Sequence, residues 1–457
     1  MALLKKCLLG IVFVGMAASG NTQVLAKHHH HHTHHSTHHY SPPVEDVAPL
    51  PSAVNGKSNL SDAINTIIAG ADPEASIGIV VKSMKSGDIL YEHNAKQLFV
   101  PASTMKILTA EAALLYLGPQ YKFPTSIFTD ARSINKGVID GNIYIVHSGD
   151  PSLTVYDIHD LMASLKAMQI QRITGNVYID TSAYDQQNFG PGWIGSDKRY
   201  CYGAPISASI INHNCLASSR GLLHTSKAKL KSVGSAVIND VIKFNQILMQ
   251  ESFKRLGISV HGNIKIGSTP PYASRLATHE SKQLHSLVST MLKKSDNIIA
   301  GSLFKKIGAL YTRQPGSWSN GSAAVKDILS KQAGVDASGA MILDGSGLSP
   351  ENTISPSQLM QVLTFAYHHS SSSYDFISAL PISGVDGTLK HRLTNISWKV
   401  RAKTGTMAGV RSLAGYAMTR DNEPLAFVIM VNGRNSAGYS YKEVEDRIVT
   451  VLTKYSQ

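Results

Sequence analysis

A serine and a lysine stand three positions apart, as Ser103 and Lys106, in the segment VPASTMKILTAEAALLYLG at 100–118. Pro101 suits the start of a helix, and the apolar residues behind it fit helical periodicity until Gly118. This spacing then places the lysine amine one helical turn from the serine hydroxyl. Because apolar surroundings disfavour the charged form of a lysine, Lys106 could act as a general base on a nucleophilic Ser103.

The S-x-x-K pattern alone is weak evidence for catalysis, because it recurs at Ser133–Lys136, Ser226–Lys229 and Ser302–Lys305. Only the first copy follows a proline into an apolar helix. Further motifs are therefore needed to support a catalytic role for Ser103.

One such motif is S-x-N at Ser295–Asn297, on the edge of a helical segment. A serine hydroxyl there can relay a proton, and the amide of Asn297 can hold a substrate carbonyl. Ser133–Asn135 fits the same pattern.

The other motif is Lys403-Thr404-Gly405-Thr406, at the end of a predicted strand. A cation and hydroxyls suit a substrate carboxylate, and Gly405 lets the backbone approach closely. Lys85–Gly87 also fits, but it precedes the serine helix.

The surrounding sequence predicts an α+β fold, with an antiparallel sheet flanked by helices. A hairpin is expected within 76–94, further strands within 398–433 and an amphipathic helix at 442–455. Residues 121–270 change to short β-like runs between turns, which indicates a β-rich inserted domain. The predicted catalytic domain therefore has an N-terminal part at 54–120 and a C-terminal part at 271–457.

Residues 1–26 are predicted to be an export signal, because Lys5 and Lys6 precede an apolar run and a small-residue cleavage site. An uncleaved membrane anchor is the alternative, so we expect a periplasmic protein that could be membrane-associated. Residues 27–53 read as a disordered linker in which nine His lie between His28 and His39. Its imidazoles could bind divalent metal weakly, but a solvated linker is the simpler interpretation.

Composition narrows the class of protein. Of the 457 residues, 43% are hydrophobic and 16% charged, which excludes disorder throughout the chain. Three cysteines are too few for a small disulfide scaffold, and Cys201 and Cys215 of the exported chain could either pair or stay as free thiols. The net charge of +12 suits a polyanionic wall but identifies no partner, and no nucleic acid is expected.

The three motifs occur in the order found in penicillin-binding proteins and class A β-lactamases. From about residue 60 onwards, the sequence resembles the class C low-molecular-mass penicillin-binding proteins, the D-alanyl-D-alanine carboxypeptidase/endopeptidases of the penicillin-binding protein 4 type. The segments that carry this resemblance include SGDPSLT (148–154), CYGAPISASIINHNC (201–215), LKKSDNIIA (292–300) and DGSGLSPEN (344–352). The fold it implies is the penicillin-binding-protein/β-lactamase-like serine transpeptidase domain.

The resemblance implies that Ser103 is the acyl-enzyme nucleophile and Lys106 its base. Ser295 would pass a proton to the leaving D-alanine, and Asn297 would hold the substrate amide. The resemblance implies neither a metal ion nor a cofactor.

The same resemblance places the substrate carboxylate on Lys403 and Thr404, with Gly405 and Thr406 completing the strand end. The backbone N–H groups of Ser103 and Thr406 would form the oxyanion hole.

The family also has a pocket for the diamino acid of the peptide. Asp197 matches the acidic residue that meets the free ammonium, and Tyr202 and Arg392 resemble other walls of this pocket. Ala408, just past the strand end, is smaller than expected there.

The implied substrates are stem peptides and cross-links of peptidoglycan, and β-lactam antibiotics would acylate Ser103. The sequence leaves open whether the protein forms a homodimer. After Cys215 the chain is shorter than in many relatives, and this difference could alter dimer contacts or endopeptidase access. Two alternatives remain: a β-lactamase, and a wall-binding or metal-buffering protein with a silent site.

Overall fold

The computed structural model describes residues 49–216, 236–369, 371–434, 436 and 438–457. The predicted signal and nearly all of the His-rich linker lie outside the described residues. A five-stranded antiparallel sheet carries the K-T-G motif on β13, and its strand order is β13-β14-β15-β2-β3. These strands are β2 (Ser76–Ser83), β3 (Ile89–His93), β13 (Val400–Met407), β14 (Val410–Met418) and β15 (Pro424–Asn432). The sheet thus joins both ends of the chain, and the predicted hairpin and C-terminal strands are confirmed.

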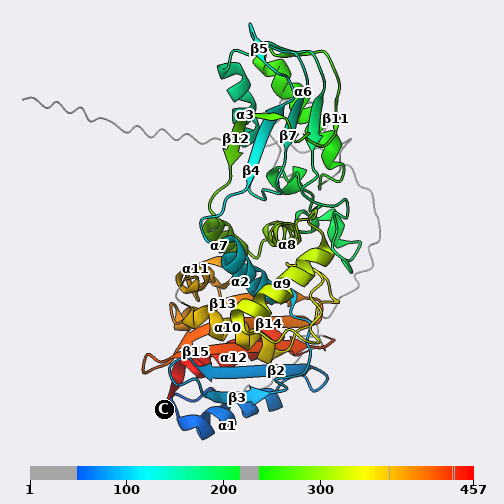
Figure 1. The fold of residues 1–457 in the computed structure, drawn as a ribbon. Coiled ribbons are helices and arrows are strands. Elements are labelled where there is room, and N and C mark those ends of the chain that lie inside the picture. The colour runs from blue at the N-terminus through cyan, green and yellow to red at the C-terminus, as the bar shows by residue number, and fades with distance from the viewer. Residues whose placement is uncertain (1–48, 217–235, 370, 435, 437) are drawn as a thin grey trace, which may run out of the picture. The chain divides into compact units, whose positions relative to one another are not determined.

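Helices cover both faces of this sheet (Figure 1). Alternate residues of β15 point to opposite faces, so Val428 and Met430 join one core while Phe427 and Ile429 join the other. The first core packs against α2 (Lys106–Leu117), α7 (Leu284–Lys294), α8 (Asn297–Thr312), α9 (Trp318–Ala333), α10 (Pro356–His368) and α11 (Ser373–Ala379). The second packs against α1 (Gly56–Ala69) and α12 (Tyr441–Lys454), beside the short pair β1 (Val54–Asn55) and β16 (Tyr455–Ser456).

The inserted region forms two further sheets with a core of their own. One has the order β11-β9-β7-β4-β12, formed by β4 (Pro124–Thr129), β7 (Ile143–Val146), β9 (Val177–Asp180), β11 (Ile264–Ile266) and β12 (Ser274–Glu280). The smaller sheet contains β5 (Ile134–Asn135), β6 (Val138–Ile139), β8 (Arg172–Ile173) and β10 (Ser259–Val260). Their core includes residues of α3 (Val155–Ala167) and α6 (Val241–Leu256).

The boundaries of the insertion differ from the expected 121–270. Its last strand, β12, pairs with β4 and extends to Glu280. In addition, the stretch from Tyr184 to Ile210 packs on the catalytic helices: Tyr184 Oη donates to the Ser302 carbonyl at 2.9 Å, and Trp318 Nε1 to the Gln187 carbonyl at 2.7 Å. One continuous insertion therefore does not describe this segment, because its middle belongs to the first core.

Short 3-10 turns connect these parts at η1 (Ala102–Met105), η2 (Asp197–Arg199), η3 (Cys201–Gly203), η4 (Asn212–Asn214), η5 (Gly387–Leu389) and η6 (Thr394–Ile396). Cys201 and Cys215 form a disulfide, which settles the alternatives left open by the sequence.

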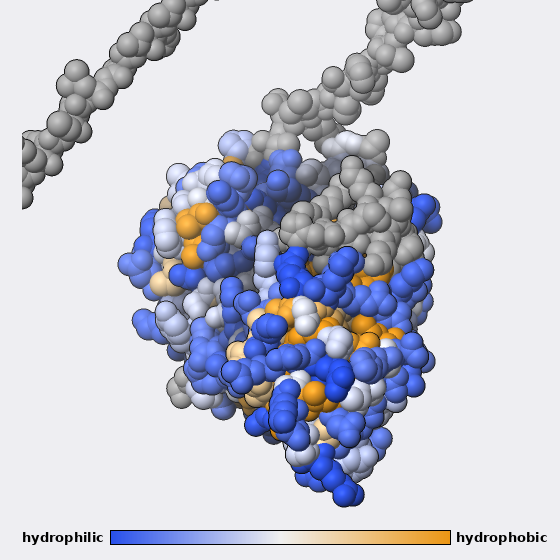
Figure 2. All heavy atoms as spheres, turned by 90° about the horizontal axis from the view of Figure 1, so that it is seen from above, coloured by the Kyte–Doolittle hydropathy of each residue, from blue (hydrophilic) through white to orange (hydrophobic). Residues whose placement is uncertain are grey.

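Seen from the end that carries the inserted sheets, the surface is largely hydrophilic around a patch of apolar side chains (Figure 2). Within the described ranges, no helix has the length and apolarity needed to cross a bilayer.

Candidate active site

The nucleophile candidate lies in the turn that leads into α2. Ser103 is part of η1, which follows Pro101, and α2 begins at Lys106. Lys106 Nζ donates to Ser103 Oγ at 2.9 Å, to Asn297 Oδ1 at 2.6 Å and to the Ser346 carbonyl at 2.7 Å. The predicted Ser–Lys hydrogen bond is therefore present, with two further acceptors around the amine.

Burial lowers the pKa of the Lys106 amine. The Lys106 side chain is fully buried, and loss of hydration lowers its pKa to about 7, against the opposing effect of the Asp344 and Asp296 carboxylates. Much of the amine is thus neutral near physiological pH, the state in which it can accept a proton from Ser103 Oγ.

A tight junction between α7 and α8 presents the second motif. Ser295 ends α7 in the left-handed conformation at φ 57°, and α8 begins at Asn297. Between them, the Asp296 carboxylate accepts from the backbone N–H groups of Ile298 and Ile299 and caps α8. This reversal lets Ser295 meet Lys403 Nζ at 2.9 Å while Asn297 meets Lys106.

The third motif lies on β13, the edge strand of the sheet. Lys403 is fully buried, and desolvation together with the charge of Lys106 holds its pKa well below the usual range. Thr404 Oγ1 donates to Thr388 Oγ1 at 2.8 Å, and Thr406 is exposed on the strand. A Cβ at Gly405 would lie 2.7 Å from the Pro101 carbonyl and 3.2 Å from Ser103 N, so this position needs glycine to let β13 approach the nucleophile.

Two of the three predicted pocket residues lie beside this network. Tyr202 Oη donates to Asp197 Oδ1 at 2.8 Å, and the Tyr202 carbonyl accepts from Asn297 Nδ2 at 3.1 Å. The Tyr202 ring is partly exposed and stacks on Tyr200 with 5.5 Å between ring centroids. Desolvation raises the pKa of Tyr202, and its hydrogen bond to Asp197 raises it further.

Arg392 is not brought to these residues by its contacts. Its Nη2 pairs with Glu445 at 2.5 Å and its Nε with Asp446 at 2.6 Å, both on α12. These contacts hold the guanidinium against α12, which covers the second core, and a role for Arg392 in the pocket stays a prediction.

Sequence reasoning also missed one contributor. The Ser346 carbonyl is an acceptor for Lys106, and the loop that carries it is built around Asp344. DGSGLSPEN was recognised as a family segment, but a backbone acceptor has no residue-type signature. Of the other S-x-x-K copies, Ser302–Lys305 serves packing, since Lys305 Nζ pairs with Asp185 at 2.7 Å.

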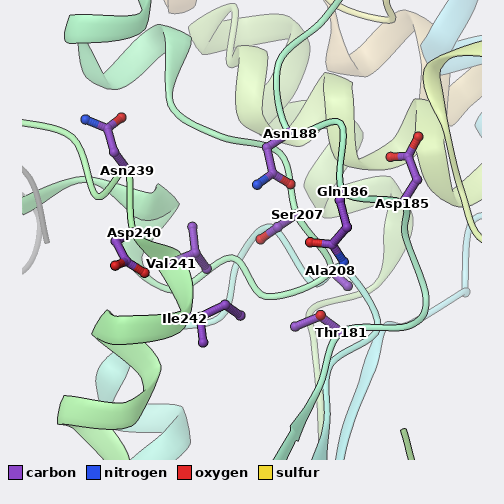
Figure 3. Close-up of a pocket in the computed structure, with 10 residues that line it drawn as sticks. All are labelled: Thr181, Asp185, Gln186, Asn188, Ser207, Ala208, Asn239, Asp240, Val241 and Ile242. Atoms are coloured by element: carbon purple, nitrogen blue, oxygen red, sulfur yellow. The ribbon is translucent and has the colours of Figure 1, made fainter. Parts of the chain in front are cut away.

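A cavity of about 370 Å³ lies away from this network, between the 181–188 stretch and the start of α6 (Figure 3). Its lining includes Thr181, Gln186, Asn188, Asn239 and the carboxylates of Asp185 and Asp240, but none of the motif residues. In the part of the chain that the structure describes, no cluster of three or more His, Cys, Asp or Glu is arranged for a metal ion.

A serine bonded to a buried lysine, an S-x-N turn and a K-T-G edge strand on a helix-flanked antiparallel sheet define a serine hydrolase of the penicillin-binding-protein and β-lactamase class. Residues 60–222 and 220–455 match the model of the D-Ala-D-Ala carboxypeptidase 3 (S13) family. The chain belongs to this family, and the predicted family and enzyme class are confirmed.

Curated relatives and solved structures agree with this assignment. The chain is 30% identical over 443 residues to D-alanyl-D-alanine carboxypeptidase DacB of Haemophilus influenzae, covering 85% of this chain and 90% of that protein. It is 28% identical to the D-alanyl-D-alanine carboxypeptidase of Actinomadura sp., covering 87% and 85%. The crystal structure of penicillin binding protein 4 from H. influenzae matches with a TM-score of 0.76 at 28% identity, covering 84% of this chain and 97% of the other. A structure of that protein complexed with a β-lactam also matches, with a TM-score of 0.71 at 26% identity.

Proposed function

We propose that this site cleaves the D-Ala-D-Ala bond of peptidoglycan stem peptides through an acyl-enzyme on Ser103. The observation that carries the proposal is the fully buried Lys106 amine, 2.9 Å from Ser103 Oγ and with its pKa lowered to about 7. Family membership supplies the substrate class.

In the first step, Lys106 Nζ takes the proton of Ser103 Oγ, which attacks the carbonyl carbon of the penultimate D-Ala. The N–H groups of Ser103 and Thr406 stabilise the resulting oxyanion, a contribution worth about 3 kcal/mol for a single donor in other enzymes. Collapse of the intermediate breaks the C–N bond and leaves the ester on Ser103.

The leaving amine receives its proton through Ser295, whose Oγ is hydrogen-bonded to Lys403 Nζ at 2.9 Å. Lys106 passes the proton that it took from Ser103 along this route, so its amine is neutral again when water attacks the ester. It then takes one proton from the water and returns it to Ser103 Oγ as the ester C–O bond breaks, which releases the shortened peptide as a carboxylic acid. The Lys106 pKa of about 7 suits transfer in both directions.

Binding of the substrate uses the groups around this network. Thr404 and Lys403 would bind the terminal carboxylate, and Asn297 the peptide amide. Asp197 and Tyr202 would receive the ammonium end of the diamino acid, since the Tyr202 carbonyl accepts from Asn297 and the Tyr202 hydroxyl donates to Asp197. A cross-linked peptide presents the same kind of bond, so we also propose endopeptidase activity on cross-links.

Several further features belong to this proposal. We propose that the protein is exported to the periplasm by residues 1–26, and that β-lactams acylate Ser103 covalently. Weak metal binding by the His-rich linker and formation of a homodimer remain predictions.

The test is intact-mass analysis of the mature protein after incubation with penicillin, alongside release of D-Ala from a labelled stem peptide. One added penicillin mass on the wild type and none on Ser103→Ala would support Ser103 as the nucleophile. Ser133→Ala is the matched control, because it removes an S-x-x-K serine on β-rich exposed chain and should keep the adduct.

The rate at which the adduct is lost separates the enzyme classes, since a peptidase releases penicillin slowly and a β-lactamase quickly. If the wild type forms no adduct and leaves the stem peptide intact, the proposed function is wrong. Deleting residues 27–50 tests the alternative of a metal-buffering protein. In that case the deletion should abolish the phenotype of the protein in the cell, whereas Ser103→Ala should leave it intact.

A further inference from the structure

A buried carboxylate organises the loop that faces the Lys106 amine. Asp344 is fully buried, and its Oδ1 accepts from the backbone N–H groups of Ser346 at 2.9 Å and Gly347 at 2.6 Å. Its Oδ2 accepts from Ser349 N at 2.9 Å and from Trp193 Nε1 at 2.6 Å. Four N–H donors therefore hold one carboxylate, a number that offsets the large cost of burying its charge.

This loop packs tightly on the nucleophile turn. The Ser346 carbonyl accepts from Lys106 Nζ at 2.7 Å, and the N–H of the same peptide unit, that of Gly347, donates to Asp344 Oδ1. Gly347 has φ 75°, and a Cβ there would lie 1.8 Å from the Ala102 carbonyl. The loop can thus lie this close to η1 only with glycine at position 347.

The proposed mechanism uses Lys106 but gives Asp344 no role. The charged groups that act on Lys106 are the carboxylates of Asp344 and Asp296, with Asp344 the larger, and they oppose the effect of burial. The Lys403 amine is coupled to Lys106 by repulsion. Asp344 is therefore linked to the amine in two ways, through the Ser346 carbonyl and through its charge.

We propose that Asp344 is a positioning residue for the reaction: it fixes the Ser346 carbonyl so that the Lys106 amine is held in line with Ser103 Oγ. Trp193, whose Nε1 donates to this carboxylate from the 184–210 stretch, contributes to the same positioning. This inference rests on the proposed function, in which Lys106 is the base.

The experiment measures the rate of acylation by penicillin from pH 5 to 9, with thermal unfolding as a separate readout. Asp344→Asn keeps the shape of the side chain but removes the charge and turns one acceptor into a donor. We expect acylation at the plateau to fall by ~10- to ~100-fold, because misplacement of a reacting group by about 1 Å has effects of this size. The acidic limb of the profile should also move to lower pH, since loss of the carboxylate charge lowers the pKa of Lys106 further.

Trp193→Phe separates the two links. It removes one hydrogen bond but keeps the carboxylate charge, so acylation should fall by about 3- to 10-fold with the acidic limb unmoved. This variant also keeps the proposal testable if Asp344→Asn does not fold, because an unchanged acylation rate in Trp193→Phe would then overturn it.

Asp130→Asn is the matched control. Asp130 accepts from Asn142 N and Nδ2 at 2.6 Å each and from Tyr144 Oη at 2.9 Å, in the inserted region. Its loss should lower thermal stability without moving the acylation profile.

Two outcomes overturn the proposal for Asp344. One is wild-type acylation in Asp344→Asn, and the other is a slower rate with the acidic limb in place, which would mean a structural role alone. Failure of the proposed function is a different result, because the wild type itself would then form no adduct.

Discussion

Replacing Gly405 by alanine tests the close approach of β13 to the nucleophile. The added methyl would lie 2.0 Å from Ser412 Oγ, 2.7 Å from the Pro101 carbonyl and 3.2 Å from Ser103 N. Ser412 cannot simply turn away, because its Oγ donates to the same Pro101 carbonyl at 2.6 Å and accepts from Thr104 Oγ1 at 3.2 Å. Strand and turn must therefore move apart by roughly 1 Å to restore van der Waals contact.

This displacement sets the expected size of the effect. Overpacking of this kind costs about 1–3 kcal/mol of unfolding free energy, and a shift of about 1 Å between reacting groups costs on the order of 100-fold in rate. The assay is acylation of Gly405→Ala by penicillin, followed by intact mass over time, with thermal unfolding measured in parallel.

A second variant makes this prediction specific. Adding Ser412→Ala removes the nearest atom, so the double variant should recover part of the lost rate, compared with Ser412→Ala alone. The reasoning is refuted if Gly405→Ala acylates within about threefold of the wild type, or if the two substitutions are simply additive.

Three other predictions address pH, the disulfide and Arg392. Acylation should fall about tenfold per pH unit below the Lys106 pKa of about 7, because the amine acts as a base only when neutral, and a rate that is flat from pH 5 to 8 would contradict this. Reduction of the Cys201–Cys215 disulfide should lower the unfolding free energy by about 3 kcal/mol, measured by denaturant titration with and without reductant, and an unchanged midpoint would speak against it. Arg392→Met should destabilise the protein by about 3–5 kcal/mol, since it leaves Glu445 buried without a partner, but should spare turnover of a stem peptide that lacks the diamino acid. A selective loss of turnover on peptides that carry the diamino acid, without loss of stability, would instead place Arg392 in the pocket.

The sequence predicted the motifs and the elements that carry them, for local reasons. Pro101 before an apolar helix and the alternating strands around Lys403 are signals that neighbouring residues encode together. The order of the three motifs then indicated the family, and with it the class of fold.

What the sequence could not predict depends on long-range contacts. Arg392 was assigned by similarity alone, and only the position of α12 shows that Glu445 and Asp446 hold its guanidinium. The Ser346 carbonyl is a backbone group, whose role follows from the hydrogen bonds of Asp344 and not from its own residue type. The packing of the 184–210 stretch on the first core is likewise a long-range contact, which neighbouring residues do not encode.

The pairing of β2 with β15 has a consequence for how this enzyme becomes active. Those strands come from opposite ends of the chain, and the KTG strand lies still further along the sheet from β2. Contacts between segments so distant in sequence form late, because a very long loop must close first. A growing chain therefore carries Ser103 and Lys106 long before it carries β13, and a fragment that ends between Lys106 and Val400 has the nucleophile but lacks the K-T-G strand. The catalytic site can thus assemble only after β13 has been made.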